Sequence, residues 1–128
     1  MREITVVAKD RVGLLADISE LLAGNGINVN SLSTETANSI AVVRLCVTGA
    51  PKAREVLETS GYKVMENDVL VVRLNDRPGE LAKIARALSE DRVNINNVFM
   101  LSKSGNETLL ALKVSNYDTA RTTLRGYL

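Results

Sequence analysis

The amino-acid sequence contains an internal repeat. The segment Asp10-Arg-Val-Gly-Leu-Leu-Ala-Asp-Ile returns 66 residues later as Asp76-Arg-Pro-Gly-Glu-Leu-Ala-Lys-Ile. From Asp10 to Asn30, 9 of 21 residues are identical to the residue 66 positions later. An offset near half of the 128-residue length indicates two copies of one structural unit, so one half predicts the fold of the other. Any site on this unit is therefore expected to occur twice, or to form where two copies meet.

The first copy, residues 1–66, predicts four strands and two helices in the order βαββαβ. β-branched residues make Glu3 to Ala8 typical of a buried strand, and leucines at helical spacing follow until Gly24-Asn25-Gly26. Pro51 suits the first turn of a second helix, and Gly61 suits its end. The remaining strands are expected over residues 27–35, 40–48 and 62–66.

The second copy, residues 67–128, predicts strands over 69–74, 93–101 and 108–114 and helices over 78–91 and 117–125. Its helical leucines, Leu81 among them, are expected in the core. Past the second hairpin turn the match continues at an offset of 67, which indicates one inserted residue in that hairpin. The chain reaches Leu128 directly after the last predicted helix, so no fourth strand is expected.

These patterns together predict an α+β protein of two tandem ferredoxin-like units. In each unit two helices are expected on one face of an antiparallel sheet. The second sheet is expected to have three strands and one bare edge, which is a feature that proteins normally cover, shorten or pair.

The composition excludes several classes of function. Residues 1–66 carry 7 basic and 8 acidic side chains and residues 67–128 carry 9 and 7, so no nucleic-acid partner is expected. The chain has one Cys and no His, which leaves no His base and no ordinary zinc site. No metal, cofactor or catalytic activity is expected. No apolar run approaches the roughly 18 residues that span a bilayer. We therefore expect a cytoplasmic protein without a membrane partner.

The repeated motif carries a family resemblance. In each copy a strand is followed by Asp-Arg-[Val/Pro]-Gly-[Leu/Glu]-Leu-Ala, a helix, and then Asn-[Val/Ile]-Asn at the start of the next strand. This pattern closely resembles the ACT domain over nearly the whole chain, twice. ACT domains are small ferredoxin-like modules that commonly bind amino acids and regulate enzymes or transcription factors. The resemblance implies a non-catalytic tandem ACT-domain protein that forms a homodimer and regulates an enzyme or another protein.

The resemblance also implies a ligand site. In amino-acid-binding ACT domains, contacts come from the turn Asp or Asn and from the Asn that opens the next strand. Those positions are Asp10 with Asn28 in the first copy and Asp76 with Asn94 in the second. A glycine without Cβ and a helix start with free N–H groups suit a carboxylate at this turn. The other candidate contacts are the remaining turn residues: Arg11, Val12, Gly13 and Leu14 in the first copy, and Arg77, Pro78, Gly79 and Glu80 in the second.

Each candidate also has a purely structural interpretation. Asp10 and Asp76 can cap the following helix, and the glycines can serve close packing alone. The arginines can be solvated, and the asparagines can bond neighbouring backbone. Cys46 can be an inert core thiol or lie on the opposite face. Serine-binding relatives often have a polar residue, such as His, two positions before the turn Asp. Here those positions are Ala8 and Leu74, so that specificity is not expected.

The sequence is also compatible with two other functions. A ligand-free adaptor would use the bare sheet edge for oligomerisation. A small enzyme of ferredoxin-like fold, such as an acylphosphatase, would need a glycine-rich phosphate-binding turn, which this sequence lacks.

Overall fold

The computed structural model describes residues Arg2 to Leu128. The chain divides into two compact units, Arg2–Asn67 and Asp68–Leu128. Each unit has its own hydrophobic core and its own antiparallel sheet.

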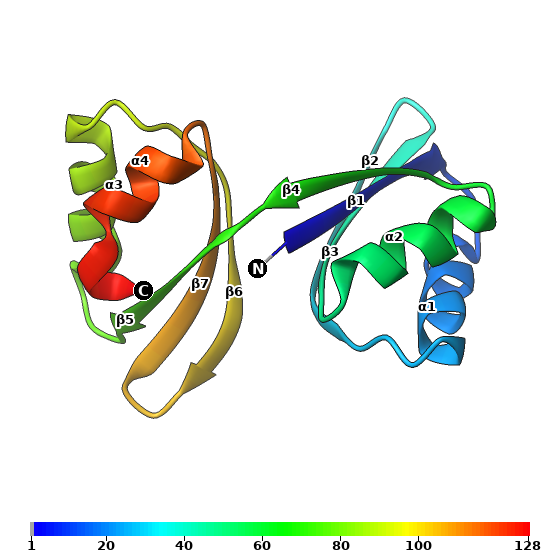
Figure 1. Cartoon of the computed structure of the whole chain (residues 1–128), viewed down its shortest axis with the longest axis horizontal. Coiled ribbons are helices and arrows are strands. Elements are labelled where there is room, and N and C mark those ends of the chain that lie inside the picture. Colours follow the sequence, from blue (N-terminus) through cyan, green and yellow to red (C-terminus); the bar gives the residue numbers. More distant parts are fainter. Residues whose placement is uncertain (1) are drawn as a thin grey trace. The chain divides into compact units, whose positions relative to one another are not determined.

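The first unit has the order βαββαβ, as the sequence predicts. Its four strands form one sheet in the order β2-β3-β1-β4, and both helices cover the same face of it (Figure 1). Alternate residues of the strands, such as Ile4 and Val43, are buried against Ile18 and Leu22 of the first helix. The elements are β1 (Arg2–Lys9), α1 (Leu14–Gly24), β2 (Val29–Ala37), β3 (Ile40–Val47), α2 (Ala50–Thr59) and β4 (Lys63–Asp68).

The second unit repeats this order without a fourth strand, which confirms the prediction. Its three strands lie in the order β5-β7-β6, with α3 and α4 on one face (Figure 1). The final short 3-10 helix contacts β5, the edge strand beside which a fourth strand would lie. The elements are β5 (Leu70–Asn75), α3 (Glu80–Glu90), β6 (Ile95–Ser104), β7 (Glu107–Val114), α4 (Tyr117–Thr123) and η1 (Arg125–Tyr127).

The last helix is shorter than predicted. It begins at a capped end, where the Asn116 side-chain oxygen accepts a hydrogen bond from the Thr119 backbone N–H at 3.0 Å. It ends at Thr123 rather than continuing to Arg125. Gly126 lies three residues later, and glycine disfavours an α-helical turn, so the remaining residues tighten into η1. Tyr127 then packs against the second core.

The inserted residue of the second copy lies in a strand. Both hairpins have two-residue turns, because Ala37 pairs with Ile40 and Ser104 pairs with Glu107. The register of β6 against β7 shifts between Met100 and Ser102, so Leu101 is the extra residue of a β-bulge. The β2–β3 ladder runs without interruption at the equivalent positions. A bulge bends its strand and changes the direction of nearby side chains.

Cys46 is buried on β3, next in sequence to the core residue Leu45. Alternation along a strand places Cys46 on the sheet face opposite Leu45, paired with Glu3 of β1. Burial raises the pKa of the Cys46 thiol to about 11, and the nearby Glu3 carboxylate adds to that shift. The protonated thiol is the inert form at neutral pH, so a reactive role is not supported.

Candidate functional site

The turn between β1 and α1 forms one wall of a pocket of about 310 Å³. The other walls come from the first turn of α1 and from the edge strand β2 with its neighbour β3. Four of the predicted site residues lie here, together with residues that the motif does not include. The pocket is lined by Asp10, Arg11, Gly13, Leu14, Leu15, Ala16, Thr34, Ala41 and Val43.

The second copy has an equivalent pocket of about 220 Å³ between β5, α3, β6 and β7. Three predicted site residues, Asp76, Arg77 and Glu80, line it. Seven lining positions correspond between the two copies through the sequence repeat. These pairs are Asp10/Asp76, Arg11/Arg77, Leu14/Glu80, Leu15/Leu81, Thr34/Met100, Ala41/Thr108 and Val43/Leu110. The duplicated fold therefore builds the same pocket twice, from different side chains.

A left-handed glycine sets the geometry of both turns. Gly13 has φ 87° and Gly79 has φ 90°, a region that residues with a Cβ rarely adopt. A Cβ at Gly79 would meet no atom within 4 Å, and one at Gly13 would meet only Arg11 Nη1 at 3.8 Å. The interpretation that these glycines serve close packing is therefore wrong. Backbone conformation requires them, because it turns the chain from the strand into the helix.

The two turn aspartates do not cap the helices. Gly13 and Gly79 occupy the N-cap positions, and neither α1 nor α3 has a side-chain cap. Each aspartate is held through its backbone instead, since the Asp10 N–H donates to Ser39 O at 2.8 Å and the Asp76 N–H to Asn106 O at 2.6 Å. The capping interpretation is wrong, and both carboxylates lie exposed at the pocket. The first N–H groups of each helix also remain without a side-chain partner.

The two carboxylates differ in their surroundings. Among residues 2–128 the Asp10 carboxylate has no hydrogen-bond or ion-pair partner. The Asp76 carboxylate lies 3.1 Å from the Lys103 ammonium. Lys103 lies on β6, where it pairs with Thr108 of β7. The corresponding position on β2 of the first copy, opposite Ala41, is occupied by Thr36, which carries no charge.

Both turn arginines pair with a carboxylate on the following helix. Arg11 Nη2 lies 2.6 Å from Asp17 Oδ2, and this hydrogen bond raises the pKa of Arg11. Arg77 Nε lies 2.8 Å from Glu80 Oε1. The Glu80 side chain is only 8% exposed, whereas that of Asp17 is 52% exposed. The hydrogen bond from Arg77 lowers the pKa of Glu80, and Lys83 adds to this effect against the opposing effect of burial.

The strand asparagines lie away from these pockets. Neither Asn28 nor Asn94 lines a turn pocket, and a helix of 11 residues, about 16 Å long, separates each from the aspartate of its own copy. Each amide donates to the asparagine two residues later, Asn28 to Asn30 at 3.1 Å and Asn94 to Asn96 at 2.7 Å. Within one copy, the predicted pairs of turn aspartate and strand asparagine are not brought together.

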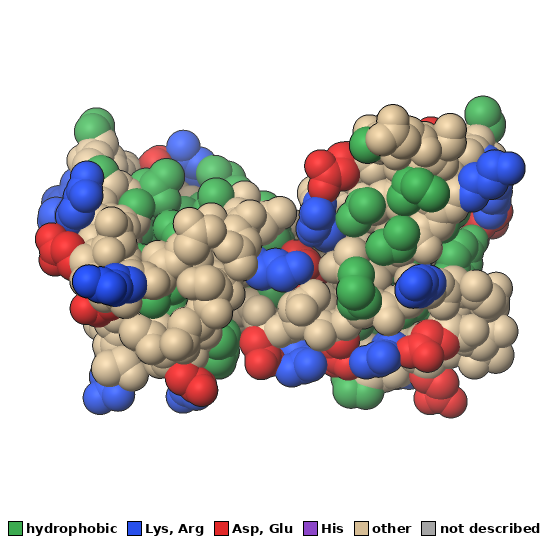
Figure 2. Space-filling view, turned by 90° about the horizontal axis from the view of Figure 1, so that it is seen from above, with side chains coloured by type: hydrophobic (Ala, Val, Ile, Leu, Met, Phe, Trp, Pro, Cys, Tyr) green, Lys and Arg blue, Asp and Glu red, His purple; other side chains and the backbone are tan. Residues whose placement is uncertain are grey.

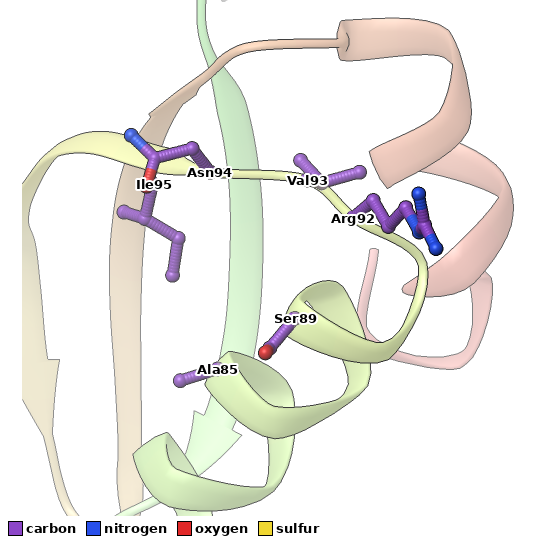
Figure 3. Close-up of a pocket in the computed structure, with 6 residues that line it drawn as sticks. All are labelled: Ala85, Ser89, Arg92, Val93, Asn94 and Ile95. Carbon is purple, nitrogen blue, oxygen red and sulfur yellow. The ribbon is translucent and has the colours of Figure 1, made fainter.

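Asn94 borders a different, shallow pocket of about 460 Å³ at the other end of α3 (Figure 3). Ala85 and Ser89 line it from the helix, and Ile95 lines it from β6. The Asn94 amide and the Arg92 guanidinium point in opposite directions there (Figure 3). These two polar groups therefore do not converge on one ligand in this arrangement.

Several residues that line the pockets are not among the contacts predicted from the sequence. Leu81 was expected in the core, but it is 49% exposed, and Leu15 is 37% exposed, because both face the pocket beside the edge strand. The strand positions Thr34 and Met100 were also missed. Their positions 66 residues apart are the one sequence signal that links them. Val12 and Pro78 were predicted as contacts, but neither lines its turn pocket, and Val12 is fully exposed.

The surface carries no single-sign field on the face shown in Figure 2, where Lys and Arg side chains lie beside Asp and Glu. Within Arg2–Leu128 no cluster of three or more His, Cys, Asp or Glu side chains is placed to hold a metal ion. None of the helices in that range combines the length and the apolar character that crossing a membrane requires.

Comparison with known proteins agrees with this architecture. The family model for an ACT domain pair matches residues 1–125, whereas no curated protein matches the chain. Protein BT0572 from Bacteroides thetaiotaomicron has the same fold at 24% identity and a TM-score of 0.90, over 98% of this chain and 86% of that one. The regulatory subunits of aspartate kinase from Thermus thermophilus (ligand-free form) and Thermus flavus match at 21% and 19% identity, with TM-scores of 0.73 and 0.66. Both matches cover 97% of this chain and 88% of the subunit. The chain belongs to the ACT-domain family as an ACT domain pair.

Proposed function

We propose that the protein is a non-catalytic regulatory module that binds a small amino acid at a β1–α1-type turn pocket and passes the signal to a partner protein. The observation that carries this proposal is the pocket built twice from corresponding positions, each with a carboxylate and an arginine at its rim. These opposite charges, a short distance apart in sequence, complement a zwitterion.

The chemistry of the first pocket illustrates the fit. The Asp10 carboxylate, which has no partner among residues 2–128, is placed to accept hydrogen bonds from an α-ammonium group. Arg11 and the uncapped N–H groups at the start of α1 suit an α-carboxylate. A volume of about 310 Å³ lies at the low end of the range for small-molecule sites, about 300–1,000 Å³. The remaining walls, Leu15 and Val43, suit a small side chain.

The family supports a regulatory output. Two of the structural neighbours are named as regulatory subunits of aspartate kinase, and at their identities the likeness extends to the fold alone. We propose by analogy that this pair acts as a homodimer on a separate enzyme or other protein. Ligand control then requires that the amino acid bind one arrangement of the ACT units more tightly than another.

The direct test is thermal unfolding followed by calorimetric titration with each proteinogenic L-amino acid in turn. A specific binder present at 100 times its dissociation constant should stabilise the chain by about 2.7 kcal/mol. Asp10→Asn should weaken the binding about 10- to 100-fold, because a charged hydrogen bond contributes about 1.5–3 kcal/mol. Asp118→Asn, an exposed carboxylate on α4 outside both turn pockets, is the matched control. If no amino acid stabilises the protein selectively, the sensing function is rejected.

A ligand-free adaptor is the second candidate function. It is favoured by exposed apolar side chains on the second unit, where Leu81, Val98 and Met100 are 46–53% exposed, and by β5 at the edge of a three-stranded sheet. Sedimentation velocity separates the candidates. An adaptor associates equally well with and without amino acids, whereas a sensor's association or partner binding changes when its amino acid is added.

A further inference from the structure

The two turn pockets differ most at one position. Leu14 begins α1 and belongs to the first hydrophobic core. Glu80 begins α3 at the corresponding position, and it is buried although it is charged. Both residues line their pockets, so the replacement of an apolar side chain by a carboxylate changes the chemistry of the pocket itself.

The Glu80 carboxylate is bound within the second pocket by its own chain. Its Oε1 accepts a hydrogen bond from Arg77 Nε at 2.8 Å and lies 3.7 Å from Lys83 Nζ. A ligand carboxylate that took Arg77 from Glu80 would leave a buried negative charge without its principal partner. Arg77 itself is 63% exposed, but the Glu80 side chain is only 8% exposed, so its carboxylate has little access to water that could replace the lost hydrogen bond. Leaving a buried carboxylate without its partner is unfavourable.

The first pocket has no such internal competitor. Arg11 pairs with Asp17, a side chain that is 52% exposed and can return to water. Exposed ion pairs of this kind contribute little to stability, so an incoming carboxylate can displace Asp17 from Arg11 at small cost. In the same pocket Asp10 has no partner among the described residues, whereas in the second pocket Asp76 pairs with Lys103.

The strand residues that line the two pockets also favour ligand binding in the first pocket. Thr34 offers a hydroxyl group to the first pocket, and the corresponding residue of the second pocket is Met100, an apolar side chain that is 53% exposed. The volumes are about 310 and 220 Å³ respectively. The second pocket is therefore smaller, and its arginine and its aspartate are both already paired.

We propose that Glu80 takes the place of a ligand carboxylate in the second pocket, so that each chain binds one amino acid, in the first pocket. This assignment rests on the proposed amino-acid-binding function and makes it specific. The residue at position 14 in the first copy, or at position 80 in the second, then determines whether the turn pocket of that copy is open to a ligand or is occupied by a side chain of the protein itself.

The test combines a wild-type measurement with two reciprocal substitutions. In the wild type, ¹H–¹⁵N spectra are recorded during titration with each proteinogenic L-amino acid. The amides of residues 11–16 should shift and those of Arg77 and residues 79–82 should not. Calorimetry should then give one site per chain for wild type and two for Glu80→Leu, which places the residue of the first copy in the second. Leu14→Glu should weaken binding roughly 100-fold or more, because it puts a carboxylate against that of the ligand.

The outcomes separate this assignment from the function on which it rests. If no amino acid binds wild type, the proposed function itself fails. If amino acids bind but Arg77 and residues 79–82 shift, or if wild type binds two per chain, the function stands and the role of Glu80 is rejected. A folded Glu80→Leu variant that keeps one site also rejects it. The spectra of wild type decide the question even if Leu14→Glu, a substitution in a buried position, does not fold.

Discussion

Replacing Gly79 by alanine isolates the contribution of backbone conformation at the turn. Gly79 has φ 90° and ψ −11°, and a Cβ there would meet no atom within 4 Å. The penalty therefore comes from the left-handed conformation alone, about 1–2 kcal/mol for a residue with a Cβ. Alanine also restricts the unfolded chain, which returns about 0.4–1 kcal/mol. We expect Gly79→Ala to lower the free energy of unfolding by about 1 kcal/mol.

Urea denaturation provides the assay, with Gly24→Ala as the matched control. Gly24 is the last residue of α1, its φ is not left-handed, and a methyl group added there would also meet open space. That substitution should therefore stabilise by about 0.5–1 kcal/mol. With a slope of about 1–3 kcal/mol per molar urea, the two midpoints should move in opposite directions by a few tenths of a molar or more. Equal shifts of the same sign would show that the sign of φ does not govern these positions.

Three further predictions follow from individual side chains. Cys46, buried with its pKa raised to about 11, should react with a thiol reagent at pH 7 only after denaturation, and fast labelling of the folded protein would contradict its burial. Asn116→Ala removes the cap of α4 and should cost about 1 kcal/mol, whereas Asn116→Ser, which can still cap, should cost much less when both are measured by urea denaturation. In the folded protein the pKa of Glu80 is lowered below its ordinary value of 4.5. The stability that the ionised carboxylate contributes is therefore complete above pH 4.5, and it is lost as the pH falls through the folded-state pKa. An acid titration of stability should accordingly become shallower in Glu80→Gln, and an unchanged profile would contradict the Arg77–Glu80 pair.

The sequence repeat was sufficient to predict the fold. Hydrophobic spacing and the glycine turns agree with the structure, because these features depend on local periodicity. The final helix shows where local reasoning ends. Its spacing continues to Arg125, but Gly126 and the packing of Tyr127 against the second core favour a 3-10 turn there.

The candidate site could be predicted only on its turn side. The motif located Asp10 and Asp76, but Thr34 and Met100 reach the pockets through strand pairing, which a single sequence does not specify. Periodicity identified Leu81 as part of an apolar helix face. It could not show that this first turn faces a pocket instead of the centre of the sheet, which is why Leu81 is half exposed. The Arg77–Glu80 pair has helical spacing, yet the burial of Glu80 depends on tertiary packing.

The two bulges in β6 make the two borders of the second sheet unequal. An added strand needs main-chain donors and acceptors at even intervals, and β6 interrupts them between Ile95 and Asn97 and again between Met100 and Ser102. The pairing of β5 with β7 keeps one register from Leu70 to Asn75. A strand added beside β5, which η1 contacts, would thus meet a regular backbone, whereas a strand added beside β6 would meet an interrupted one. Where η1 leaves room, any extension of this sheet is therefore favoured at the β5 edge.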